Sequence, residues 1–177
     1  MKTKLVLVNI LLAALLLAGC APKTKDFRSE AGKFSVKAPV TLEEQPQTIN
    51  VSGGKVEAHT YLGEKDDIAY VVAYSDYRQE VVNQSTLDEM LNNARDSMIS
   101  SANGKLILET RISLGDTVGR EFTLDYEMLD GNDGTMKARI YLVKNRLYQV
   151  MVLADKANAD AASITKFLDS FKLLGDQ

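Results

Sequence analysis

Apolar and polar positions follow two periods along the chain, and these periods predict strands and helices. Alternation with a period of two is typical of a half-buried strand, and it runs through Lys33–Ala38, Lys55–Leu62 and the segments 106–114, 118–128 and 136–142. Ile68–Tyr74 and Leu147–Ala154 are apolar almost throughout, as in strands buried on both faces. Pro39 follows the first strand directly and favours an edge position for it.

Two segments have the helical period instead. Ser85–Glu89 offers an N-cap with carboxylates in the first turn, and Gly104 is a stop signal. The apolar stripe between them consists of Leu87, Met90, Leu91, Ala94, Met98 and Ala102. A second helix is predicted over Ala159–Leu173, with a stripe of Ala161, Ile164, Leu168 and Phe171.

The order of these elements indicates the fold class. Strands come first, then one helix, then four strands joined by short turns, then the last helix. Such an order predicts an α+β domain, an antiparallel sheet with helices packed on it, rather than a doubly wound fold. Lys137 and Arg139 are expected to pair with the acids of the preceding strand across the Asp130–Gly134 hairpin.

The first residues are expected to be a targeting signal and not a part of the folded domain. Lys2 and Lys4 precede an apolar run over Leu5–Leu17, and two small residues follow, which is the layout of a secretory signal. Leu17-Ala18-Gly19-Cys20 resembles the bacterial lipoprotein signal. The resemblance implies that the Cys20 thiol takes a diacylglycerol and that its amine takes a third acyl chain.

Two other interpretations of this segment compete. An uncut membrane-spanning helix needs about 20 apolar residues, and this run is shorter. A disulfide at Cys20 has no second cysteine in the chain, so only an intermolecular bridge would remain. We therefore expect residues 1–19 to be a signal peptide, 20–29 a lipidated tether, and 30–177 a single domain.

The charged residues of the chain indicate which classes of binding partner to expect. The chain has 21 basic and 24 acidic residues, and residues 1–19 contain two of the lysines and no acid, so the mature chain is more acidic than the precursor. Nucleic-acid binding depends on neutralising phosphates with clustered Lys and Arg, and no such cluster occurs in the sequence. We expect no nucleic-acid partner. We expect a membrane contact through lipid, in the bacterial envelope, and Ala21 after the cysteine favours the outer membrane of a diderm cell by the same resemblance.

Three packing patterns resemble one family. They are Gly32–Pro39, Gly119-Arg120-Glu121 and Phe167–Phe171, within a match over about residues 27–174. Together with the order of elements, they look like the PsbP-like superfamily, with the layout of its DcrB-like bacterial lipoproteins. The resemblance implies an α/β/α sandwich and a protein that binds or assists assembly, without a shared catalytic centre.

Catalytic and metal chemistry find little support in the sequence. His59 is the only histidine and no G-x-S-x-G nucleophile elbow accompanies it, so we expect a surface residue and no enzyme. One histidine and one cysteine cannot make a zinc cluster. Asp130–Gly134 lacks the alternating ligands of an EF-hand and is expected to be a plain hairpin turn. We expect no metal and no cofactor.

The remaining candidate is a partner-binding surface. Tyr61 and Tyr141 fall on the charged sides of their strands, where exposed aromatic residues often serve recognition. The surface predicted on this basis, for an envelope protein partner, consists of Glu57, His59, Tyr61, Lys137, Arg139 and Tyr141. An ordinary solvated face explains the same pattern. Two other functions stay open: a small-ligand binder with a tyrosine-lined pocket between helix and sheet, and a hydrolase that uses His59 with nearby acids.

Overall fold

The computed structural model describes residues 24–51 and 54–175. Ten strands and three α-helices with one short 3₁₀ helix make up this part of the chain. In order they are β1 Lys25–Ser29, β2 Phe34–Ala38, β3 Glu43–Val51, β4 Gly54–Lys65, β5 Ile68–Asp76, α1 Gln79–Asn83, α2 Leu87–Ser101, β6 Lys105–Leu114, β7 Thr117–Glu127, β8 Asp133–Val143, β9 Arg146–Asp155, η1 Lys156–Asn158, α3 Ala162–Asp169 and β10 Lys172–Leu173.

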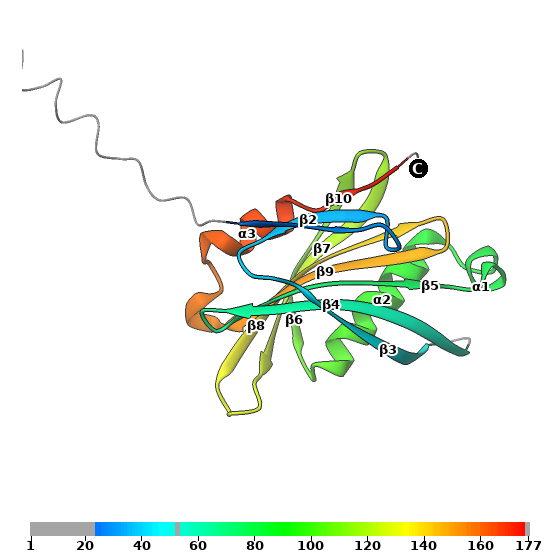
Figure 1. The fold of residues 1–177 in the computed structure, drawn as a ribbon. Helices are drawn as coiled ribbons and strands as arrows, with labels where there is room; N and C mark the ends of the chain where they lie inside the picture. Colours follow the sequence, from blue (N-terminus) through cyan, green and yellow to red (C-terminus); the bar gives the residue numbers. More distant parts are fainter. Residues whose placement is uncertain (1–23, 52–53, 176–177) are drawn as a thin grey trace, which may run out of the picture.

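The strands form two antiparallel sheets. The large sheet has seven strands in the order β3-β4-β5-β9-β8-β7-β6, and the small sheet has the order β1-β2-β10. Figure 1 shows β1, β2, β10 and α3 together on one side of the large sheet, whereas α2 lies on the other side. The α+β class with an antiparallel sheet is therefore confirmed.

An aromatic core fills the space between the two sheets. Phe34 of β2 is fully buried there, and its ring lies 5.6 Å from the ring of Tyr61 and 5.6 Å from that of Phe171, between centroids. Tyr70 of β5 packs edge-on against Phe167 of α3, with 5.2 Å between the centroids. Side chains from both sheets and from α3 thus form one continuous core.

A second core lies under α2. Leu91 and Ala94 of this helix pack on Phe122, Leu124 and neighbouring apolar residues of β7 and β8. Thr86 caps the helix with a complete capping box, because its hydroxyl accepts from the Glu89 amide while the Glu89 carboxylate accepts from the Thr86 amide at 2.7 Å. The predicted helix and its N-cap are confirmed, and Ala102 is the C-cap, two residues before Gly104.

Both ends of the domain differ from the expectations. Lys25–Ser29, which was expected to belong to the tether, pairs with β2 and forms β1. As a result β2 lies between β1 and β10, and the predicted edge position is wrong. The predicted C-terminal helix is shorter than expected and is flanked by η1 and β10, so Phe171 contributes to the core from outside α3.

The sandwich also differs from a purely α/β/α arrangement. One outer layer is α2, but the other combines α3 with a three-stranded sheet. The short helix α1 was not expected, and it has no buried residue. Within the described residues, no helix is both long enough and apolar enough to cross a bilayer.

Loss of the α2 cap should destabilise the domain measurably. We expect Thr86→Ala to lower the free energy of unfolding by about 1 kcal/mol, measured by urea denaturation at neutral pH. Hydrogen bonds from Thr86 keep the pKa of Glu89 below its usual 4.5, so the carboxylate is present at neutral pH and is lost as the pH falls through that lowered pKa. The difference between wild type and Thr86→Ala should therefore shrink in acid.

Ser100→Ala, at an exposed position of the same helix, is the control for this prediction. An equal loss in Thr86→Ala and Ser100→Ala would contradict the role of the cap.

Candidate functional site

The two tyrosines of the predicted partner surface are buried. Tyr61 is 6% exposed and Tyr141 is 3% exposed, and both belong to the aromatic core. The Tyr61 ring contacts Phe34, and the Tyr141 ring stacks on Phe171 with 6.0 Å between centroids. The expectation of exposed aromatic residues is wrong, because β2, β10 and α3 cover the side of the sheet on which both tyrosines lie.

The charged members of that surface are engaged in separate contacts. Arg139 binds Glu121 on the neighbouring strand, as predicted, and also Asp169 at the end of α3 at 2.7 Å. Lys137 lies opposite Thr123 and pairs with Asp160 at 3.0 Å, so its predicted pairing with an acid of the preceding strand is wrong. The side chain of Glu57 lies outside the described residues. The six residues therefore do not form one exposed surface.

His59 has an acid and an aromatic ring as neighbours. Its Nδ1 lies 3.0 Å from the Glu44 Oε1, and its ring stacks on Tyr74 with 4.7 Å between centroids. Burial raises the pKa of Tyr74 to about 12, so this hydroxyl stays protonated at neutral pH and is a poor base. A carboxylate beside the imidazole meets one requirement of the hydrolase alternative. A nucleophile oriented by the histidine is the other, and neither described contact of the ring supplies one.

The acidic hairpin forms a turn. Asp130 accepts hydrogen bonds from the backbone and the side-chain amide of Asn132, and Gly131 takes a positive φ of 82°. Among the described residues, no group of three or more His, Cys, Asp or Glu side chains is arranged to hold a metal ion. The Asp130 carboxylate is committed to the turn, as expected for hairpin chemistry.

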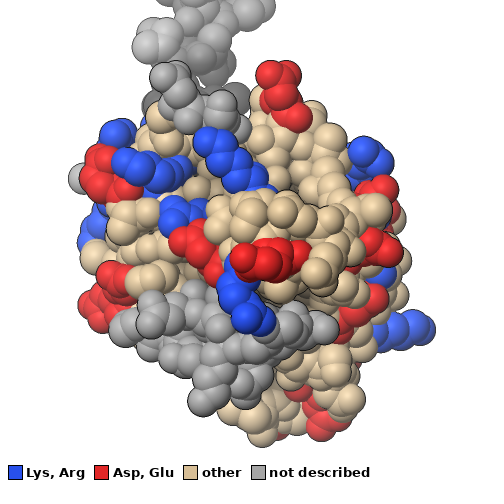
Figure 2. Space-filling view, turned by 90° about the vertical axis from the view of Figure 1, so that its right-hand side faces the viewer, with Lys and Arg blue, Asp and Glu red and all other residues tan. Residues whose placement is uncertain are grey.

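Charges on the surface are mixed in sign. Figure 2 shows Lys and Arg interspersed with Asp and Glu on the end of the molecule that carries α1 and the turn before β9. Arg146 and Asp76 form one of the ion pairs in this region, with the Nε and Nη2 of Arg146 each 2.6 Å from an oxygen of Asp76. The Arg146 guanidinium also lies 4.5 Å from the centroid of the Tyr74 ring. Among the described residues in this view, basic and acidic side chains are mixed and form no patch of a single sign that would attract a polyanion.

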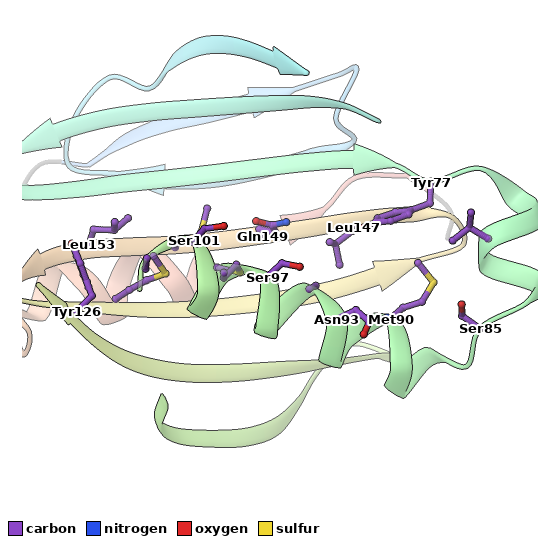
Figure 3. Close-up of a pocket in the computed structure, with 16 residues that line it drawn as sticks. Tyr77, Ser85, Met90, Asn93, Ser97, Ser101, Tyr126, Leu147, Gln149 and Leu153 are labelled. Carbon is purple, nitrogen blue, oxygen red and sulfur yellow. The ribbon is translucent and has the colours of Figure 1, made fainter. Parts of the chain in front are cut away.

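A large hollow lies on the opposite side of the large sheet from the small sheet. It is a groove of about 830 Å³ between α2 and β9, with Tyr77 and Ser85 at one end and Tyr126 and Leu153 at the other (Figure 3). We call it the α2–β9 groove. It exists because α2 packs on β7 and β8 and leaves the neighbouring strand β9 open on this face. A volume of this size is typical of ligand sites.

The lining of the α2–β9 groove is apolar with an uncharged polar rim. Asn93, Ser97 and Ser101 project from the exposed side of α2 toward β9, and Gln149 of β9 lies in the floor (Figure 3). Flexible and aliphatic side chains form most of the rest: Met90, Ala94, Met98, Ala102, Met136, Leu147, Met151 and Leu153. Among these described residues none carries a formal charge.

A second hollow adjoins the first. It has a volume of about 740 Å³, and it shares Tyr126 and Leu153 with the α2–β9 groove. Residues 64–69 of the β4–β5 hairpin line it together with Met128, Leu129 and Asp130. Leu129 is fully exposed at the tip of the β7–β8 loop. The second hollow is therefore a neighbour of the α2–β9 groove, and its wall is partly charged, with Glu64, Lys65, Asp66, Asp67 and Asp130 in it.

The small-ligand alternative had a tyrosine-lined pocket between helix and sheet. Two tyrosines, Tyr77 and Tyr126, line the α2–β9 groove. Most of the wall is instead a row of methionines and small residues. The signal that could have shown it is the spacing of Asn93, Ser97 and Ser101, which puts three short polar side chains on one line beside the apolar stripe.

The fold itself is that of a PsbP-like domain. No family model and no curated protein matches the chain. The solution structure of cyanobacterial PsbP from Synechocystis sp. PCC 6803 is similar, with a TM-score of 0.55 and 12% identity over 88% of this chain and 95% of that chain. A protein of unknown function from Pseudomonas aeruginosa, PA94, described as a putative regulator, has a TM-score of 0.43 at 12% identity over 76% of this chain and 85% of that one.

The burial of Tyr61 predicts a structural role for it. We expect Tyr61→Ala to lower the free energy of unfolding by about 3–5 kcal/mol, as large-to-small changes of buried aromatic residues do. Tyr61→Phe keeps the ring and removes the hydroxyl, which lies 3.1 Å from the Ser29 hydroxyl and also interacts with Tyr74, so it should cost about 1 kcal/mol. Thermal and urea unfolding of the three proteins measure both effects. A Tyr61→Ala protein as stable as the wild type would instead favour a surface role.

Proposed function

We propose that the protein is a lipid-anchored, non-enzymatic binding protein of the bacterial envelope, and that it holds an envelope component in the α2–β9 groove. The groove carries the proposal, since it is large, apolar and lined by a few uncharged polar groups, the features that mark binding sites. The PsbP-like fold agrees with this class of function without specifying it. The layout of the sequence resembles that of DcrB-like lipoproteins.

The face suggested by the sequence is the weaker site. Its tyrosines are occupied in the aromatic core, and its charges form ion pairs with their own neighbours. A partner would have to break these contacts before it gained any of its own. The α2–β9 groove needs no such rearrangement, because its polar rim already faces solvent.

The membrane anchor rests on the sequence at Cys20. Two or more acyl chains bind a bilayer stably, at about 0.8 kcal/mol per buried methylene, whereas one chain is marginal. A cysteine that carries a diacylglycerol and an amine-linked chain meets this requirement. Only the four residues between Cys20 and Lys25 separate the acylated position from β1, so the domain would stay within about 20 Å of the bilayer.

A photoreactive side chain in the groove tests the binding function. The full chain carries benzoylphenylalanine in place of Ser97, at the rim of the groove, and is irradiated in living cells of the source organism. We expect a covalent adduct, lipid or protein, visible as a mass shift of the purified protein. The matched control places the same residue at Ser100, which is exposed on the same helix outside the groove. Equal labelling at both positions, or no labelling at either, would refute the proposed site.

The anchor is tested separately. Cys20→Ala should abolish incorporation of labelled palmitate and should block cleavage after Gly19, while the wild type fractionates with membranes after salt washing. Ala21→Asp is the informative companion, because it keeps the acylated cysteine and should move the protein from the outer to the inner membrane in a diderm host. A wild type without label, or one that washes off membranes, would contradict the proposal.

A further inference from the structure

We propose that the occupant of the α2–β9 groove is a single uncharged aliphatic chain, namely the acyl chain of a membrane lipid that is distinct from the lipid on Cys20. The inference rests on the proposed function and names its ligand. Charge, side-chain type, shape and position of the groove each support it.

The charge of the lining selects a neutral ligand. Charged residues make up 25% of the chain, so a lining of 16 residues with that composition would include about four. The α2–β9 groove has none among its described residues. A charged ligand group placed there would lose its hydration without a counter-charge, which is strongly unfavourable. A hydrocarbon chain that enters the groove has no charged group whose hydration would be lost.

The methionines suit a flexible chain. Five methionines occur after the signal segment, and all of them line the two hollows: Met90, Met98, Met136 and Met151 in the groove and Met128 in its neighbour. Methionine has three rotatable bonds and adapts to irregular apolar shapes. A wall of this kind can follow a chain that itself takes many conformations.

The α2–β9 groove is long. Its lining on α2 extends from Met90 to Ala102, which is about 18 Å at 1.5 Å per residue. The polar rim of Asn93, Ser97 and Ser101 stays exposed along this length. One side of the occupant would therefore contact the apolar side chains of the groove, and the other side would lie beneath short hydroxyl and amide groups. These groups can form hydrogen bonds with water and need no charged group on the ligand.

The second hollow lies where a lipid would arrive. In Figure 1 the β4–β5 hairpin and the start of β1 are at the left-hand end of the molecule and the β7–β8 loop is at its lower left, so the described chain begins at the end that carries this hollow. The exposed Leu129 is part of the β7–β8 loop at the mouth of the second hollow. An acyl chain that enters from the bilayer passes this leucine first, and its polar head group stays at the mouth of the second hollow, beside the exposed charged side chains of Glu64, Lys65, Asp66, Asp67 and Asp130.

The test uses the acylated protein in vesicles of phosphatidylcholine in which one acyl chain carries a diazirine. The protein is made in cells without the probe, so its own acyl groups are silent. After irradiation we expect probe adducts on peptides from α2 and β9, located by mass spectrometry. Ser97→Trp and Ser101→Trp fill the rim and should reduce these adducts by about tenfold, whereas Ser100→Trp should leave them unchanged.

The outcomes separate the two proposals. Adducts confined to the Leu129 loop, or an absence of adducts in α2 and β9, would overturn the lipid-chain inference, since the groove would then be empty or filled by the protein's own lipid. If the Ser97 photoprobe nevertheless captured a protein in cells, the binding function would stand with a different ligand. If neither experiment labelled the groove, both proposals would fall. Circular dichroism and thermal unfolding of the three tryptophan variants establish that each is folded.

Discussion

The burial of Phe34 between two sheets is the contact on which the rest of the domain depends. Its ring meets those of Phe27, Tyr61, Tyr74, Tyr148 and Phe171, which come from β1, β4, β5, β9 and the end of the chain. Each such pair contributes about 0.5–1.5 kcal/mol beyond the area it buries. Gly32 allows the close approach, because a Cβ there would lie 2.6 Å from the Phe34 ring, and its carbonyl accepts from the Tyr148 hydroxyl at 2.8 Å. This cluster closes one face of the large sheet.

The other face of the large sheet is partly open because only one helix covers it. The aromatic side is sealed by a sheet and a helix together, whereas a single helix, α2, lies over β7 and β8. One helix is about 10 Å wide with its side chains, and neighbouring strands are about 4.8 Å apart, so α2 can cover roughly two strands of seven. The uncovered part of β9 forms the floor of the groove. The large sheet thus has a densely packed aromatic core on one face and the α2–β9 groove on the other.

Local patterns in the sequence predicted the helices and strands well, but they did not predict what packs on each face of a strand. The strands from β4 to β9 and the capped helix α2 were anticipated, because each is defined by a period within one segment. Alternation separates the two sides of a strand but does not say what covers each side, and for this reason Tyr61 and Tyr141 were placed in solvent. The β6 bulge between Leu106 and Leu108 shifts the alternation, so that Leu108 is 61% exposed. The groove required α2 and β9 to be placed together, which no local signal provides.

The attachment of α2 suggests how the groove can adapt without loss of the fold. The described ion pairs from this helix to other elements all reach toward β6 and β7: Arg95 binds Glu109 at 2.6 Å, and Asp88 binds Arg120 at 2.9 Å. Hydrogen bonds to Asp96 and Glu109 raise the pKa of Arg95, so its charge is secure over the physiological range. Arg95, Glu109 and Arg120 are largely buried, so loss of the Arg95–Glu109 pair would leave a buried charge without its partner, whereas the Asp88 side chain is 57% exposed. The groove side is held by apolar contacts, which weaken gradually with distance and have no fixed geometry. Small displacements of α2 would therefore change the width of the groove while the ionic contacts on its far side stay intact.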